Sequence, residues 1–98
     1  NDIENKQFKQ AEKKFLKSLQ LVPNRESVLN NLSSVQMRLN KYGDAKKSVL
    51  QVVKLNPKNA VGWMNLALCE QALNNYGAAL KGFNNSVEID PLYYHAYK

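Results

Sequence analysis

Residues 60–93 read AVGWMNLALCEQALNNYGAALKGFNNSVEIDPLY, and this stretch decides the fold because the chain repeats its pattern. When the sequence is shifted by 34 residues, positions of the same character coincide along most of its length. A fixed period of this length indicates stacked helical units that form a solenoid. The clearest coinciding sets are Pro23, Pro57 and Pro91; Ala11, Ala45 and Ala79; Phe8, Tyr42 and Tyr76; and Phe15, Val49 and Phe83.

Each unit is predicted to contain two helices. Apolar residues recur at spacings of three and four, as on one face of an α-helix, over about 26–39 and 42–55 and again over about 60–73 and 76–89. The connection at Asn40 and Lys41 is short enough to require antiparallel neighbours. We expect residues of about 7–21 to form the second helix of an earlier unit, and residues 1–5 to end its first helix.

Small and large residues alternate at the predicted helix contacts. We expect Ser33, Ala45, Ala67 and Ala79 to lie where helices cross, because packed helices leave little space there. The larger side chains would fill the core beside them. These are Tyr42, Trp63, Tyr76 and Phe83.

The pattern of Trp63, Leu66, Ala67, Tyr76, Ala79, Phe83 and Pro91 resembles the tetratricopeptide repeat, which has Trp, Leu, a small residue, Tyr, Ala, an aromatic residue and Pro at these places. The resemblance implies an all-α fold, a right-handed superhelical solenoid of antiparallel helix hairpins. Its units would be 26–59 and 60–93, with the second half of one unit at 1–25 and the start of another at 94–98. We therefore expect a segment excised from a longer protein, with exposed ends that can self-associate.

The composition argues against several classes of function. No apolar run approaches the length of a membrane span, and no signal peptide is visible, which favours a cytoplasmic location. One cysteine, Cys69, and one histidine, His95, are too few for a zinc site, and Cys69 is expected to be a buried apolar residue. No catalytic set or phosphate-binding loop is present, so we predict no enzyme activity, no cofactor, no metal and no small-molecule substrate.

The net charge of +6 is concentrated near the start of the chain, where Lys6, Lys9, Lys13, Lys14 and Lys17 lie at helical spacing. Such a stripe is usually solvated surface, although it can attract nucleic acid. Aromatic residues are not interleaved with the lysines, which argues against a nucleic-acid partner.

The resemblance also implies where a partner binds. The first helix of each unit in this family lines a concave groove, in which an extended peptide or partner helix lies. On that face we predict Ser27, Asn30, Asn31, Ser34, Met37 and Arg38 of one unit and Val61, Met64, Asn65, Leu68 and Gln71 of the next, continued by His95 and Lys98. We expect Val61, Met64 and Leu68 to form an exposed apolar patch.

Two interpretations of Asn31 and Asn65 stay open. They resemble the asparagine ladder of O-linked N-acetylglucosamine transferases, in which side-chain amides hold a peptide backbone, or they are simply common, partly solvated residues of the repeat. Chaperone-binding members hold a C-terminal carboxylate with Lys and Asn at positions that here carry Asn30 and Ser34. Heat-shock-protein binding is therefore not predicted.

The sequence thus predicts a non-catalytic scaffold for protein–protein interaction, which binds a protein or peptide in its concave groove. The alternative is a substrate-recruiting arm of a larger enzyme, such as a glycosyltransferase similar to the O-linked N-acetylglucosamine transferases.

Overall fold

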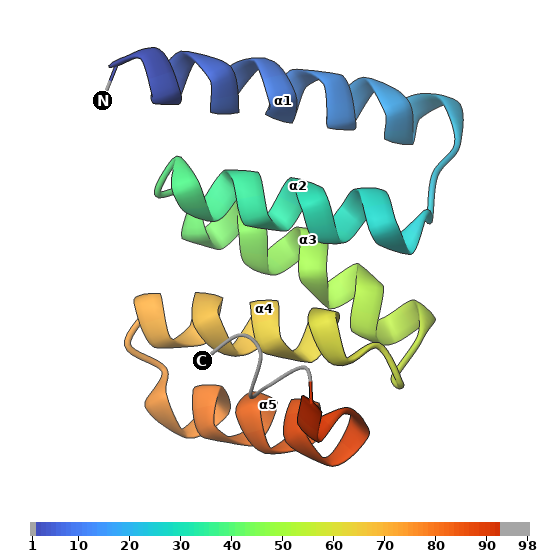
Figure 1. Cartoon of the computed structure of the whole chain (residues 1–98), viewed down its shortest axis with the longest axis vertical. Helices are drawn as coiled ribbons and strands as arrows, with labels where there is room; N and C mark the ends of the chain where they lie inside the picture. The colour runs from blue at the N-terminus through green and yellow to red at the C-terminus, as the bar shows by residue number, and fades with distance from the viewer. Residues whose placement is uncertain (1, 93–98) are drawn as a thin grey trace.

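The computed structural model describes residues 2–92, which form five helices and no strand. They are α1 (Asp2–Leu21), α2 (Glu26–Arg38), α3 (Tyr42–Leu55), α4 (Ala60–Ala72) and α5 (Tyr76–Ile89), stacked in chain order (Figure 1). Helices α2 and α3 make one antiparallel hairpin and α4 and α5 the next. The four helices predicted after residue 25 are confirmed to within a residue.

The helix contacts define an inner and an outer side of the stack. Helix α2 contacts α1, α3 and α4, and α4 contacts α2, α3 and α5. Within residues 2–92, α3 has no close backbone contact with α1 or α5. The first helices of the two hairpins are therefore neighbours on the inner side, whereas the second helices are held apart on the outer side. This arrangement is the repeat solenoid that the 34-residue period predicts.

Asparagines at positive φ make the turn inside each hairpin. Asn40 has a φ of 62° and Asn74 one of 66°, a left-handed conformation that asparagine tolerates better than most residues. The backbone N–H of Lys41 donates to the Gln36 carbonyl at 2.8 Å, and that of Asn75 to the Glu70 carbonyl at 2.8 Å. These bonds satisfy carbonyl groups that the end of a helix leaves without partners.

Helix α1 departs from the expected arrangement, because it begins at Asp2 and runs without interruption to Leu21. The expected end of an earlier helix at residues 1–5 is therefore wrong for residues 2–5, and Asn1 lies outside the described part. The position that matches Asn40 and Asn74 is Lys6. Lysine does not favour the left-handed conformation of the hairpin turn, so the helix continues through this point.

The core lies between the hairpins and follows the predicted pattern of small residues. Ala45, Ser33 and Ala67 have no exposed surface, and Ala79 is 4% exposed. Hydroxyl groups also join paired helices at their crossings: Ser33 Oγ donates to the Ala45 carbonyl at 3.1 Å and Ser86 Oγ to the Ala60 carbonyl at 3.0 Å. The prediction that small residues occupy the crossings is confirmed.

The larger side chains follow the prediction in part. Trp63 is half-buried, packs against the core, and donates from Nε1 to the Pro57 carbonyl at 2.8 Å. Phe83 is also half-buried. Tyr76, in contrast, is 65% exposed, so its placement in the core is wrong. Within the described residues α5 contacts only α4, and no helix covers the Tyr76 side of it.

Cys69 is fully buried, as predicted. Burial disfavours the thiolate and raises the pKa of the thiol to about 11. The side chain therefore behaves as a small apolar core residue.

Two polar clusters join successive layers at equivalent positions. In the first, Glu12 of α1 accepts from Gln36 Nε2 at 3.2 Å and from Lys41 Nζ at 2.8 Å. In the second, Lys46 of α3 pairs with Glu70 at 2.9 Å, and Asn75 Nδ2 donates to the same carboxylate at 3.2 Å. The three positions of one cluster are each 34 residues from those of the other, with the charges on the two helices exchanged.

The packing of α4 against α3 gives a first prediction. A Cβ atom on Gly62 would lie 2.8 Å from Val52 Cγ1, inside the buried contact between the two hairpins. Gly62→Ala is expected to destabilise the protein by about 1–3 kcal/mol through overpacking, although alanine favours helix. The control is Gly43→Ala, because nothing lies within 4 Å of a Cβ there; it should stabilise by up to about 1 kcal/mol. Chemical denaturation measures both, and equal effects would contradict the close approach.

The first polar cluster predicts a loss of stability in acid. Burial opposes the ionisation of Glu12, but hydrogen bonds from Lys41 and Gln36 outweigh it and hold the pKa of Glu12 below its ordinary value of 4.5. The stability from this lowered pKa is present above about pH 4.5 and is lost as the pH falls through the folded-state value. Glu12→Gln should flatten the curve of unfolding free energy against pH in that acid range. The same change at Glu88, outside both clusters, should leave the curve unaltered.

Candidate functional site

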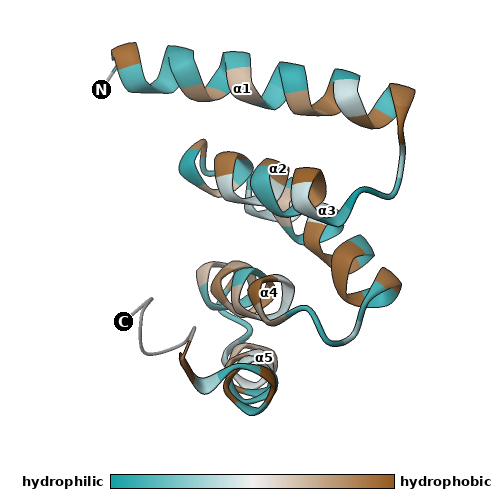
Figure 2. Ribbon diagram, turned by 45° about the vertical axis from the view of Figure 1, so that its right-hand side comes forward, coloured by the Kyte–Doolittle hydropathy of each residue, from teal (hydrophilic) through white to brown (hydrophobic). Residues whose placement is uncertain are grey.

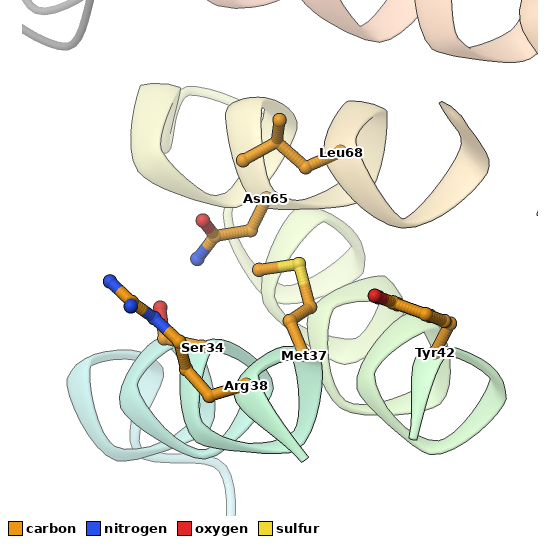
Figure 3. A pocket seen from close by; sticks show the side chains of 6 residues that line it. All are labelled: Ser34, Met37, Arg38, Tyr42, Asn65 and Leu68. Carbon is orange, nitrogen blue, oxygen red and sulfur yellow. The ribbon is translucent and has the colours of Figure 1, made fainter. Parts of the chain in front are cut away.

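A hollow of about 330 Å³ lies between α2 and α4, with one wall from the start of α3. Its position agrees with the contact between the two first helices, which places it on the inner side of the stack. Figure 3 shows side chains from the three helices directed into a common space. The lining residues are Ser34, Met37, Arg38, Tyr42, Asn65 and Leu68.

Four of the eight candidate residues on which we base the site come together here, namely Ser34, Arg38, Asn65 and Leu68. Met37, predicted for the same face, joins them. Asn31 is exposed and Val61 is half-buried, and neither lines the hollow. The positions expected to continue the row, His95 and Lys98, lie outside the described residues.

Asn30 and Met64 are not on the surface of the groove. Met64 has no exposed surface, so the expected exposed patch of Val61, Met64 and Leu68 is wrong at its centre. The reason is that α4 is enclosed by α2, α3 and α5, which cover more of it than an amphipathic helix usually loses. Asn30 is 8% exposed, and its Nδ2 donates to Asn59 Oδ1 at 3.4 Å.

Asn59 and Glu26 extend the contact of Asn30 into a network. Asn59 Oδ1 also accepts from the backbone N–H of Gly62 at 2.9 Å and so caps α4. Glu26 accepts from Asn59 Nδ2 and from Asn56 Nδ2, each at 3.0 Å. These two hydrogen bonds lower the pKa of Glu26. Asn30 thus belongs to the polar contact that joins α2 to the start of α4.

The amide of Asn65 is the most distinctive group of the hollow. Asn65 is only 5% exposed, yet its Nδ2 is buried and has no hydrogen-bond partner. Figure 3 shows this nitrogen pointing from α4 toward Ser34 and Arg38 on α2. A buried donor without an acceptor costs about 1–3 kcal/mol, so such groups need an explanation, and a bound acceptor is one.

The polar groups around Asn65 are also donors. Arg38 carries a guanidinium group with several N–H donors, and the Ser34 hydroxyl can donate as well. Arg38 lies with its Cζ 6.0 Å from the centre of the Phe8 ring, a contact that ties its side chain to α1. No carboxylate is among the six lining residues. The hollow therefore favours a ligand that presents carbonyl or carboxylate oxygens.

Tyr42 lines the hollow although the sequence analysis places it in the core. It is half-buried, and its hydroxyl donates to Asn40 Oδ1 at 3.0 Å, which holds the ring beside the hairpin turn. Figure 3 shows the ring at the far end of the hollow from Arg38, beyond Met37. One aromatic position thus packs on a helix and presents an edge to the groove, which helical periodicity alone does not distinguish.

The proposed asparagine ladder does not have equivalent steps. Asn31 is 34 residues before Asn65 but is exposed, whereas Asn65 is covered by α2. The helix that would cover Asn31 in the same way is not among the described residues, because α1 runs straight instead of turning back. Asn65 is therefore the single amide of the two that is enclosed at a helix contact.

Residues 2–92 were also compared with two other kinds of site. No helix among them is both long enough and apolar enough to cross a membrane. In the same residues, no group of three His, Cys, Asp or Glu side chains lies close enough together to hold a metal ion.

Two stacked helix hairpins with a groove between their first helices define a helical repeat array, a class of protein that uses its concave surface for binding. Residues 26–59 match the family model described as a tetratricopeptide repeat. The chain therefore belongs to the tetratricopeptide-repeat family through this unit, as the sequence pattern predicts, and the fold of the rest agrees. A search of curated protein sequences gives no match.

Solved structures support the same fold. The first tetratricopeptide-repeat domain of Spaghetti (RPAP3), bound to the HSP90 peptide SRMEEVD, is 20% identical with a TM-score of 0.85; the match covers 92% of this chain and 71% of that one. The MamA RS-1 ArsTM double mutant is 22% identical with a TM-score of 0.82; that match covers 93% of this chain and 52% of the other. None of these comparisons points to a glycosyltransferase.

The unpartnered amide gives a prediction about stability. Asn65→Ala removes a buried donor that has no partner, so the unfolding free energy should change by less than about 1 kcal/mol. Gln36→Ala is the matched control, since Gln36 is also a 5% exposed amide but bonds to Glu12 at 3.2 Å and to Ser48 at 2.8 Å. It should cost at least about 1–3 kcal/mol. A similar loss for both variants in thermal and chemical denaturation would mean that Asn65 has a structural partner.

Proposed function

We propose that this chain is a non-catalytic scaffold whose groove between α2 and α4 binds an extended peptide segment of a partner protein. The observation that carries the proposal is the buried Asn65 Nδ2, which has no partner and points into a hollow. An extended peptide presents carbonyl oxygens along its length, and one of them supplies the missing acceptor. A first neighbour of the same fold holds a peptide, which supports this class of ligand.

The remaining groups of the hollow have distinct parts in this proposal. Arg38 and Ser34 donate to a neighbouring carbonyl or to an acidic side chain of the peptide. Met37 and Leu68 contact an apolar side chain, and methionine adapts to side chains of different shape. Tyr42 limits the length of that side chain at the far end.

The test uses peptides selected from a displayed random library on the chain and then synthesised. Asn65→Ala should weaken the binding of a selected peptide roughly tenfold, as expected for one lost hydrogen bond of about 1.4 kcal/mol. Asn84→Ala, the same change at an exposed position on α5, should leave the affinity within a factor of about two. Fluorescence anisotropy measures each dissociation constant. Selected peptides that ignore Asn65→Ala would refute the proposed groove.

A second probe is the peptide SRMEEVD, which the Spaghetti domain binds. Chaperone-binding members of the family use Lys and Asn at the positions of Asn30 and Ser34. Here Asn30 is buried and bonded to Asn59, and a serine replaces the asparagine. We expect this peptide to bind more weakly than a selected internal peptide. Removal of its free C-terminal carboxylate by amidation should change little.

A further inference from the structure

A second surface lies on α1, away from the groove. Lys6, Lys9, Lys13 and Lys17 are three or four residues apart, so they share one side of the helix, and all four are exposed. We call this set the lysine face. In Figure 2 hydrophilic residues run along the whole of α1. The acid of the same stretch, Glu12, is turned to α2, where Gln36 and Lys41 hold it.

The stacking of helices does not cover this face. On α3 the equivalent positions are Asn40, Gly43, Lys47 and Gln51, and each is exposed although α3 lies between α2 and α4. A helical unit packed on the other side of α1 would therefore leave the lysine face open as well. The exposure of these lysines follows from their register in the repeat, and not from the position of α1 in the chain.

The lysine face has relief and an apolar component. Lys13 and Lys17 lie between two open hollows, one of about 400 Å³ with Gln10 and Lys14 and one of about 300 Å³ with Leu16 and Gln20. Leu16 is 46% exposed. Neither hollow is lined by a carboxylate, and within residues 2–92 no ion pair neutralises these lysines. The surface therefore combines uncompensated positive charge with a leucine at its edge.

We propose that the lysine face binds an acidic amphipathic helix of a partner protein. Carboxylates at every third or fourth position of such a helix match the spacing of the lysines, and an apolar residue between them contacts Leu16. The aromatic residues of α1 are not available to stack on bases: Phe8 and Phe15 are half-buried, and Phe8 lies beside Arg38. This favours an acidic helix over single-stranded nucleic acid.

The lysine face is separate from the groove, so the two proposals can fail independently. The hollow that contains Asn65 has residues from α2, α3 and α4 only, whereas the lysine face belongs to α1. Asn65→Ala should leave binding at the lysine face unchanged. A partner could therefore occupy both surfaces with two segments of its chain.

The probe is a synthetic helix-forming peptide with glutamate at every fourth position and leucine between, and its scrambled sequence serves as a control. Lys13→Glu/Lys17→Glu should lower its affinity for the full chain roughly tenfold or more, since two attractions become repulsions. Lys58→Glu/Lys81→Glu makes the same change in net charge at exposed positions away from α1, and should alter the affinity by less than about twofold. Circular dichroism confirms that both variants are folded.

Selective loss with the α1 variant, for the patterned peptide and not the scrambled one, is the expected result. Equal loss in both variants would overturn the proposal, because the attraction would then depend only on net charge. A single-stranded DNA oligonucleotide or phosphatidylserine vesicles are the competing probes. Tighter binding of either one through Lys13 and Lys17 would also overturn it, because the partner would not be an acidic helix.

Discussion

The close approach of α4 to α3, at Gly62 against Val52, is the contact on which the rest of the fold depends. It leaves no space for a Cβ atom, and so brings the second hairpin onto the first. Helix α4 then lies against α2 as well as α3 and α5. The groove exists because of this enclosure, which also covers Asn65 on one side while its amide nitrogen stays without a partner. One steric constraint thus sets both the stacking and the chemistry of the candidate site.

The period of the sequence predicts the helices well, because hairpin turns and apolar stripes depend on local residues. It does not predict where α1 begins, since periodicity continues through residue 6 whether or not a turn occurs there. An asparagine that accepts positive φ marks the turn at Asn40 and Asn74, and Lys6 lacks that property. The site is predicted less completely. A helical stripe tells which side a residue faces, but not how many neighbours cover it, so Asn30 and Met64 were placed on a surface that α2, α3 and α5 in fact enclose.

Charge is divided unevenly between the interior contacts and the outer surface. Three of the eight acidic residues, Glu12, Glu26 and Glu70, are held by hydrogen bonds at junctions between layers. The lysines of α1 have no such partners, so the net charge of +6 is expressed mainly outside. The groove in turn contains donors without acidic neighbours. The same economy of carboxylates therefore gives both candidate surfaces their preference for oxygen-rich or acidic ligands.

The exchanged charges of the two polar clusters fix the order in which the units can follow one another. Glu12 suits Gln36 and Lys41, whereas Lys46 suits Glu70 and Asn75. If residues 26–59 were duplicated in tandem, Lys46 of the first copy would face Gln36 and Lys41 of the second, which places two ammonium groups together. The repeats are thus alike in backbone but not interchangeable. An array of this kind can grow by copying only if the new junction is altered, so each boundary carries a record of its own neighbour.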